Sequence, residues 1–278
     1  MKTIGIVGLG VMGGSFAARA KELGYTVIGF DLNQKALDEA LAKGILDEGC
    51  ARPADGLGKC ETVILCLYPT LMEGWMKENG QHLHPEAIVM EIGGVKNTLV
   101  DQLEPLMPEG RELVNIHPMC GREGRGLKFS SPQIFNQANF IIVPGAKTSA
   151  KGIVEASSLA KDLGCGKISV LNADEHDDMI AFLSQLTHVI AVCLMNTHDN
   201  EHLVAYSGDS FRDLTRIAKI NEDMWSELFL LNKEKLLNEI DAFSDSLAHF
   251  RKALDEEDTE TMKELFISST QKRMKFDR

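Results

Sequence analysis

Short apolar runs alternate with helical patterns from Lys2 to Leu171. The opening run, Lys2 to Val7, is apolar throughout, as in a strand that is buried on both faces of a parallel sheet. Strands are expected at residues 2–7, 26–30, 62–67, 87–92, 112–116, 139–143 and 167–171. Helices are expected at residues 15–23, 34–43, 71–79, 97–107 and 149–163. This βαβ alternation with short links predicts an α/β domain with an open, doubly wound parallel sheet.

From Ala173 onward the strand pattern stops and long helical patterns follow. One helix is expected from Asp174 to about Asn196, and two more at residues 222–254 and 259–275. The sequence therefore predicts two domains, residues 1–172 with the sheet and residues 173–278 with helices only. The apolar content of the last helices is high for a monomeric appendage, which predicts that they form the interface of a homodimer.

A glycine-rich turn joins the first expected strand to the first expected helix. It reads Gly8-Leu9-Gly10-Val11-Met12-Gly13, and the second expected strand ends at Asp31. In the dinucleotide-binding pattern, Gly8 would form the tight turn, Gly10 would let a pyrophosphate approach the backbone, and Gly13 would let helix and strand pack closely. Asp31 would accept the ribose hydroxyls and repel a 2′-phosphate. No arginine follows in residues 32–34, so the cofactor predicted is NAD rather than NADP.

Three further segments follow the ends of expected strands, and in a parallel sheet these ends share one rim. They are Tyr68-Pro69-Thr70, Gly93-Gly94-Val95-Lys96, and His117. Because ligands of doubly wound sheets bind at this rim, the first segment is assigned to the cofactor and His117 is expected to face it. An imidazole beside a loop that is rich in glycine and arginine suits proton transfer near an anionic ligand.

Composition limits the partners. The net charge of −12 argues against a nucleic acid or an anionic membrane surface. The six cysteines have neither a CxxC pair nor zinc-site spacing, which favours free thiols in a reducing compartment. The chain opens on a strand-like segment rather than a signal peptide, and no apolar run approaches ~18 residues. A soluble cytoplasmic protein is expected.

The remaining histidines and arginines allow more than one interpretation. On the helix from Asp174, His188 ends a row with Asp177, Ala181 and Ser184, which is either a buried hydrogen-bonded row or the edge of a ligand site. Arg216 follows a Gly/Ser loop at 207–210 and is either a carboxylate clamp or a surface ion pair. The two histidine pairs at 82/84 and 198/202 have no third ligand at a suitable spacing, so no metal site is predicted.

Five motifs together resemble the prephenate/arogenate dehydrogenase family of tyrosine biosynthesis. They are GLGVMGGS from Gly8, GGVK at 93–96, HPMCGREGRG at 117–126, EHDDMIAFLSQLTH at 175–188 and SFRDLTRIA at 210–218. The resemblance covers essentially the full chain. It implies a Rossmann-like domain followed by an all-α dimerisation domain, and NAD-dependent oxidative decarboxylation of prephenate to 4-hydroxyphenylpyruvate.

The resemblance also implies roles for single residues. His117 would be the catalytic base that accepts the proton of the ring hydroxyl, Arg216 would clamp a substrate carboxylate, and His188 would line the same pocket. Gly208 is assigned to that pocket as well. Arg122 is a candidate for a further anion contact, on charge alone.

Three positions depart from the family pattern. Many members have a serine at the position of Gly94, where its hydroxyl orients the catalytic histidine. Gln185 and Thr187 stand where the familiar SHLPH has a histidine and a proline, and Arg122 stands where small hydroxyl residues are common. These departures affect the expected rate, pocket detail and choice between prephenate and arogenate, while the reaction class is retained.

The same features allow two alternative functions. A β-hydroxyacid dehydrogenase shares the GLGxMG opening and a helical second domain, but its lysine on an interdomain helix has no counterpart between Ala173 and Ala218. A non-catalytic NAD-sensing protein would retain His117 and Arg216 without turnover, and Gly94 is the observation that favours it.

Overall fold

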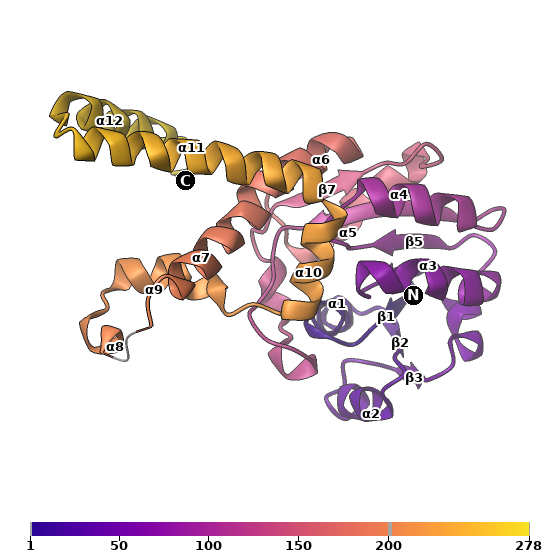
Figure 1. Ribbon diagram of the computed structural model, residues 1–278. Coiled ribbons are helices and arrows are strands. Elements are labelled where there is room, and N and C mark those ends of the chain that lie inside the picture. Colours follow the sequence, from indigo (N-terminus) through magenta and orange to yellow (C-terminus); the bar gives the residue numbers. More distant parts are fainter. Residues whose placement is uncertain (1, 200–201, 278) are drawn as a thin grey trace. The chain divides into compact units, whose positions relative to one another are not determined.

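A mixed eight-stranded sheet is the centre of the fold in the computed structural model, which describes residues 2–199 and 202–277 (Figure 1). The strand order is β3-β2-β1-β4-β5-β6-β7-β8. The strands are β1 (Thr3–Val7), β2 (Thr26–Phe30), β3 (Glu48–Cys50), β4 (Thr62–Leu65), β5 (Ile88–Glu91), β6 (Glu112–Pro118), β7 (Phe140–Val143) and β8 (Ile168–Val170). The order reverses direction at β1 and β4, as expected of a doubly wound sheet, and the predicted fold class is confirmed.

The prediction of an entirely parallel sheet was wrong at one edge. Strands β1 to β6 run parallel, but β7 pairs antiparallel with β6, so that His117 lies opposite Ile141. A parallel neighbour requires a crossover, usually through a helix, whereas the segment from Met119 to Asn139 forms only short 3₁₀ turns. The chain therefore turns back and runs alongside β6. The pairing extends as far as Pro118, past the expected strand end at residue 116.

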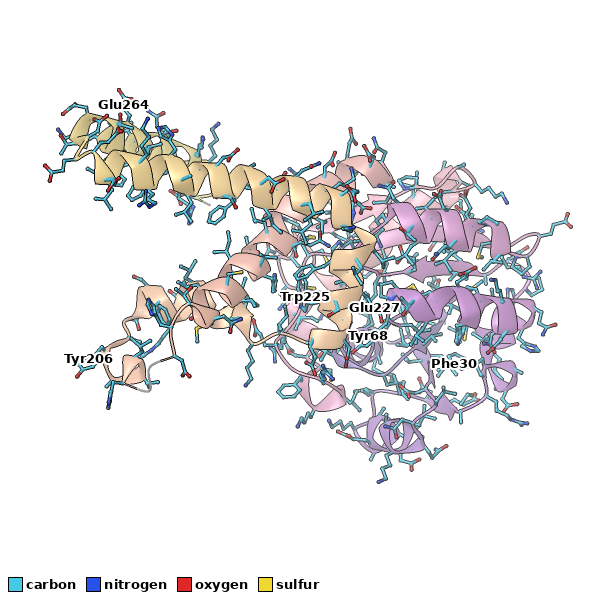
Figure 2. The ribbon with its side chains drawn as sticks, viewed as in Figure 1. Phe30, Tyr68, Tyr206, Trp225, Glu227 and Glu264 are labelled. Atoms are coloured by element: carbon cyan, nitrogen blue, oxygen red, sulfur yellow. The ribbon has the colours of Figure 1, made fainter. Side chains whose placement is uncertain are left out.

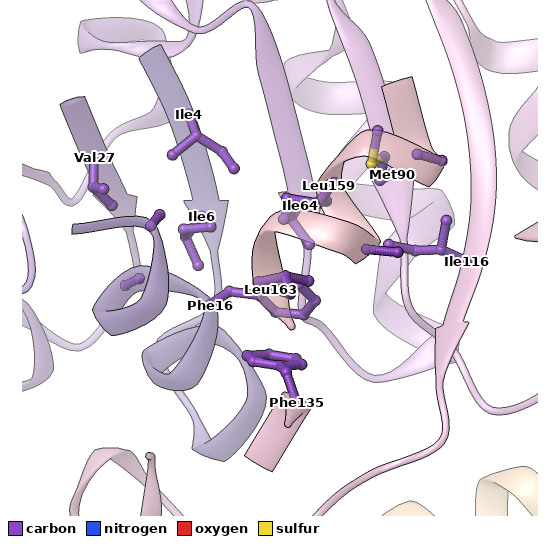
Figure 3. Close-up of a cluster of buried hydrophobic side chains, with 14 of the residues drawn as sticks. Ile4, Ile6, Phe16, Val27, Ile64, Met90, Ile116, Phe135, Leu159 and Leu163 are labelled. Carbon is purple, nitrogen blue, oxygen red and sulfur yellow. The ribbon is translucent and has the colours of Figure 1, made fainter. Parts of the chain in front are cut away.

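Helices cover both faces of the sheet and enclose two hydrophobic clusters. Helices α1 (Val11–Glu22), α2 (Gln34–Ala42) and α5 (Ala150–Leu163) pack on one face, and α3 (Pro69–Asn79) and α4 (Asn97–Leu103) on the other. In the first cluster the rings of Phe16 and Phe135 lie 4.6 Å apart beneath Ile6 and Ile64 (Figure 3). Apolar residues that were expected to form strands buried on both faces do so.

One continuous helical stretch follows the sheet. It consists of α6 (Ala173–Ile180), a π-helical segment (Ala181–Leu186) and α7 (Thr187–Asn196). Asn172, rather than the predicted Asp174, is the N-cap; it forms a capping box with Glu175, and the helix begins at Ala173. This 24-residue stretch is long and apolar enough to cross a membrane by length and composition, which corrects the expectation about apolar runs; about 28% of its most apolar window is buried within the chain.

The C-terminal helices differ from the prediction at one point. The helix expected at residues 222–254 is divided into α10 (Glu222–Leu231) and α11 (Lys233–Asp255). Asn232 between them is buried, and its side-chain amide donates to the carbonyl of Asp177 and to Oε1 of Gln185, both at 2.9 Å. These bonds hold the chain away from helical geometry at that residue. The other helices are α8 (Leu203–Tyr206), α9 (Asp209–Thr215), a 3₁₀ turn (Arg216–Ala218) and α12 (Thr259–Met274).

Contacts within the chain separate two compact units, Met1–Asn232 and Lys233–Arg278. The second unit is a pair of helices, α11 and α12, in which the rings of Phe250 and Phe266 lie 6.1 Å apart. The division into compact units does not test the predicted domain boundary between residues 172 and 173. That boundary stays a prediction.

Candidate active site

The glycine-rich turn has the geometry that its sequence predicts. Gly8 has φ +87°, a left-handed conformation that favours glycine, and its N–H donates to Phe30 O at 2.8 Å. A Cβ on Gly13 would lie 1.8 Å from the carbonyl oxygen of Gly8, so any side chain there would force α1 away from β1. A Cβ on Gly10 would meet nothing within 4 Å, which leaves open space at the N-terminus of α1. Unpaired N–H groups at that helix end favour a phosphate.

A groove of about 390 Å³ adjoins this turn. Its lining residues are Leu9, Gly10, Asp31, Asn33, Lys35, Ala36, Glu39, Arg125, Gly126, Leu127 and Lys128. Asp31 directly follows β2, and its carboxylate accepts the N–H of Leu9 at 2.7 Å and that of Asn33 at 2.8 Å. Asp31 thus holds the glycine-rich turn and borders the groove. The space and donors fit the adenosine and phosphates of a dinucleotide.

The segment after β4 lies against α10. Tyr68 caps α3, and Pro69 occupies its first turn. The hydroxyl of Tyr68 accepts a hydrogen bond from Asn221 at 3.0 Å, and the N–H of Thr70 donates to Glu227 at 3.3 Å. Figure 2 shows Tyr68 beside Trp225 and Glu227 of α10. Helix α10 therefore lies along the rim where the sheet strands end.

His117 is the first member of a hydrogen-bonded chain. Its Nδ1 lies 2.8 Å from Nε2 of His176, and Nδ1 of His176 lies 2.7 Å from Oδ1 of Asp177. His176 and Asp177 are buried in the second turn of α6. The carboxylate of Asp177 also accepts the N–H of Lys96 at 2.8 Å and that of Asn97 at 2.9 Å, so it is fixed to the loop after β5.

This order of partners fixes the tautomers. An ionised Asp177 only accepts, so Nδ1 of His176 carries the proton and its Nε2 accepts. The proton between the two rings therefore belongs to Nδ1 of His117, and Nε2 of His117 keeps its unshared pair. Burial first, then the imidazole of His176 and the ammonium of Lys96, hold the pKa of His117 well below its ordinary value. Burial also lowers the pKa of His176, against the opposing effect of the hydrogen bond that Nδ1 of His176 donates to Asp177.

A buried ion pair supports the strand that carries His117. The ammonium of Lys96 contacts Oε1 of Glu91 at 2.5 Å and donates to the carbonyl of Ile116 at 2.8 Å, and both side chains are wholly buried. The second carboxylate oxygen of Glu91 accepts the N–H of Gly93 at 2.6 Å. Such a pair is strongly destabilised when one partner is removed, because the other charge remains buried. The loop after β5 and the end of β6 are thereby tied together.

His188 lies at a different place from His117. Its ring stacks on Trp225 with centroids 3.7 Å apart, and its Nδ1 donates to Ser184 O at 2.8 Å. Burial lowers the pKa of His188, and the charges of Glu123 and Arg216 also act on it. The π-helical segment changes the helical rotation between Asp177 and His188. The expected row is thus divided: Asp177 faces the loop after β5, and His188 faces α10.

The predicted arginines are on the surface. The guanidinium of Arg216 pairs with the carboxylate of Glu123 from the loop after β6, and the Arg216 side chain is 64% exposed. The 3₁₀ turn that carries Arg216 packs against α7, which carries His188, so the pair lies on the same side as that ring. Arg122 is exposed, and Gly208 caps the N-terminus of α9. These placements leave Arg216 accessible to a carboxylate ligand, while roles for Arg122 and Gly208 stay predictions.

Sequence reasoning missed His176. It is 59 residues from His117 in sequence, and no periodic pattern brings the two together. The adjacent His176-Asp177 dipeptide at the start of a helix that follows the sheet was the available signal. Among the described residues, 2–199 and 202–277, no group of three or more His, Cys, Asp or Glu side chains could hold a metal ion.

Two departures from the family pattern meet at one residue. A Cβ on Gly94 would lie 3.1 and 3.2 Å from the two δ-carbons of Leu228. Gln185 donates its side-chain amide to the carbonyl of the same Leu228 at 2.9 Å. Position 94 therefore lies beneath an apolar side chain of α10, and the orientation of His117 comes from His176.

Comparisons with known proteins agree with this geometry. Residues 16–169 match the family model of the prephenate dehydrogenase nucleotide-binding domain, and residues 172–268 match that of the prephenate dehydrogenase dimerization domain. Prephenate dehydrogenase of Bacillus subtilis is 29% identical over 94% of this chain and 72% of its own length. Cyclohexadienyl dehydrogenase of Zymomonas mobilis is 28% identical over 98% of this chain and 95% of its own length.

A solved structure extends the likeness to three dimensions. Prephenate dehydrogenase from A. aeolicus, in complex with hydroxyphenyl propionate and NAD⁺, superposes with a TM-score of 0.90 at 30% identity, over 100% of this chain and 99% of that one. The two family models together span both the sheet and the helices that follow it. This chain belongs to the prephenate dehydrogenase family.

Proposed function

We propose that this chain is an NAD-dependent prephenate dehydrogenase that converts prephenate to 4-hydroxyphenylpyruvate. The observation that carries the proposal is the chain Asp177–His176–His117. It presents an unprotonated imidazole nitrogen at the rim where a doubly wound sheet binds its ligands. Family membership supplies the substrate class.

The chemistry divides between cofactor and protein. When bound, NAD accepts the hydride from the ring carbon that bears the hydroxyl. Nε2 of His117 accepts the hydroxyl proton, the ring carboxylate leaves as CO₂, and the proton returns to the oxygen as the ring becomes a phenol. While His117 holds the proton, the acceptor nitrogen of His176 and the carboxylate of Asp177 stabilise its charge. General-base catalysis of this kind contributes roughly 100- to 10,000-fold.

Substrate carboxylates need local positive charge in a chain with a net charge of −12. Arg216 is exposed, and its partner Glu123 is replaceable by a substrate carboxylate. His188 lies near this pair. Its Nδ1 donates to Ser184 O, which leaves its Nε2 to accept a hydrogen bond from the ligand. We assign Arg216 and His188 to the substrate side of the pocket and Asp31 with the glycine-rich turn to NAD.

The second candidate is a dual-specificity enzyme that also oxidises arogenate. The likeness to a cyclohexadienyl dehydrogenase over nearly the whole of both chains favours it. Prephenate and arogenate differ in a side-chain keto or amino group, far from the atoms that His117 contacts. NADH formation with each substrate offered separately tests both proposals. Turnover of prephenate supports the reaction, the ratio of kcat/KM values decides specificity, and NAD binding without turnover of either contradicts the proposal.

The assembly proposed is a cytoplasmic homodimer. Large apolar side chains are exposed on the helices from α6 to α9, namely Phe182, Leu183, Met195, Leu203, Val204, Tyr206, Phe211 and Leu214. The C-terminal helices α11 and α12, which were predicted to form the interface, also expose Leu237, Phe243, Leu247, Leu254, Phe266 and Ile267. Exposed apolar surface of this extent is typical of a protein interface. A second copy of the chain would cover it, in keeping with the match to a dimerization domain.

The acid limb of kcat/KM, which reports the free enzyme, should lie below pH ~6.5, the ordinary pKa of histidine. The active form of His117 is neutral, and its pKa is lowered mainly by burial. Activity is therefore expected to persist as pH falls through ~6.5 and to be lost only near the lower folded-state pKa. The unfolded imidazole takes up a proton below ~6.5 while the folded one does not, so unfolding becomes easier over the same range. The value of kcat/KM from initial rates well below KM, measured from pH 5 to 8, tests this; a limb at or above pH ~6.5 contradicts it.

Asp31→Asn should reduce the preference for NAD over NADP by roughly tenfold, because it removes the carboxylate that repels a 2′-phosphate. An amide oxygen at this position can still accept the N–H of Leu9 and so retain the glycine-rich turn. Asp31→Ser removes the charge and shortens the side chain, and should raise the KM for NAD further. The measurement is kcat/KM with each cofactor, and Asp38→Asn on the exposed side of α2 is the control. An unchanged ratio would remove Asp31 from the ribose site.

A further inference from the structure

Leu228 joins three parts of the active site that are far apart in sequence. Its side chain packs on the loop after β5, where a Cβ on Gly94 would come within 3.1 and 3.2 Å of its δ-carbons. Its carbonyl accepts the amide of Gln185 from the π-helical segment at 2.9 Å. Leu228 is buried. A glycine at 94 therefore leaves the space that this leucine fills.

A buried polar clamp sets the position of Leu228. The side-chain amide of Gln185 makes two hydrogen bonds. Its Nε2 donates to Leu228 O, and its Oε1 accepts from Asn232 at 2.9 Å. Asn232 also donates to the carbonyl of Asp177 at 2.9 Å. Gln185 and Asn232 are both buried. The clamp thus ties α10 to the residue that orients His176.

The same side of α10 reaches the second histidine. Trp225 lies one helical turn before Leu228, so the two residues share a face, and it stacks on His188 at 3.7 Å. One residue covers Gly94 and the other covers His188. Movement of α10 would change both contacts together.

We propose that Leu228 is a positioning and specificity-determining residue, and that Gln185 and Asn232 hold it over Gly94 to set the distance between α10 and the loop after β5. The proposal rests on the proposed function and names a determinant of its substrate pocket. The apolar side chain closes the loop side of the site to water and faces an apolar substrate ring. Gly94 and Leu228 are complementary in size, so changes at one should depend on the other.

A double-mutant cycle tests the pair. Gly94→Ala is expected to lower kcat/KM for the dienol substrate roughly tenfold, and Leu228→Ala to lower it by a similar factor. The double variant should be roughly tenfold more active than the product of the single effects, because the new methyl occupies space that the leucine vacates. Gly74→Ala is the control, since this exposed glycine of α3 has nothing within 4 Å of an added Cβ. If Leu228→Ala does not fold, Leu228→Val removes the same δ-carbons with a smaller cavity.

Gln185→Met tests the clamp, because it preserves volume and removes both hydrogen bonds. The KM for the substrate should rise roughly tenfold, and the KM for NAD should stay within about twofold, since the two hydrogen bonds removed run to Leu228 and Asn232 rather than to the glycine-rich turn. Gln81→Met, at an exposed position, is the control. A merely structural role would lower the unfolding temperature without separating the two KM values.

Thermal unfolding of the same variants distinguishes failure of this proposal from failure of the proposed function. If the native protein oxidises neither dienol, the proposed function fails, while the Tm cycle still reports coupling between Gly94 and Leu228. Coupling in Tm supports the pair. Additive effects in Tm, or in kcat/KM where turnover is present, overturn it, as does a Gln185→Met variant with native KM values.

Discussion

Replacement of His117 by asparagine is expected to lower kcat by roughly 100- to 10,000-fold, with little change in the affinity for substrate or NAD. Asparagine can retain a hydrogen bond to Nε2 of His176, but it cannot accept the hydroxyl proton at physiological pH. The residual rate would come from NAD and the orientation of the substrate alone.

The experiment needs kcat from steady-state NADH formation and substrate affinity from equilibrium binding to the variant. His249→Asn is the matched control, because this histidine is exposed on α11. A variant with near-native kcat would remove His117 from the chemistry. A variant that has lost binding of substrate and NAD as well would indicate damage to the pocket rather than loss of a base.

Asp177→Asn is expected to lower kcat by roughly 100-fold or more and to destabilise the protein. The substituted amide can donate to Nδ1 of His176 and so favour the opposite tautomer. The proton would then shift along both rings and leave Nε2 of His117 protonated in the neutral state, where it cannot act as a base. In addition, the N–H groups of Lys96 and Asn97 would lose their carboxylate acceptor.

Three measurements separate these effects. Ring-nitrogen NMR of His117 should show a change of tautomer, kcat should fall at a native-like KM, and the unfolding temperature should decrease. Asp178→Asn, at the next and exposed position of α6, is the control. Loss of stability with an unchanged tautomer and kcat would reduce Asp177 to a structural role.

Local sequence was sufficient to predict the conformation of the glycine-rich turn. Gly8 and Gly13 occupy positions where φ or a carbonyl 1.8 Å from the added Cβ excludes a side chain, and Asp31 lies at a strand end beside the groove. These features depend on residues within one βαβ unit, so spacing alone defines them. Strands β1, β2, β4 and β5 follow from apolar runs for the same reason, whereas the short β3, which reads Glu-Gly-Cys, was not predicted.

Tertiary structure decided how the catalytic half is assembled. The reversal of β7, the contact of His176 with His117, and the meeting of Gly94, Gln185 and Leu228 all join segments that no local pattern relates. Their positions depend on the rotation of the helix after the sheet, which a π-helical segment changes, and on the break at Asn232, which buried hydrogen bonds fix. The sequence by itself therefore determined most of the strands, the order of sheet and helices and the conformation of the glycine-rich turn, because these features are local. The packing of helices against the rim determined which side chains orient that base, because contacts between distant residues depend on three-dimensional geometry rather than on periodicity.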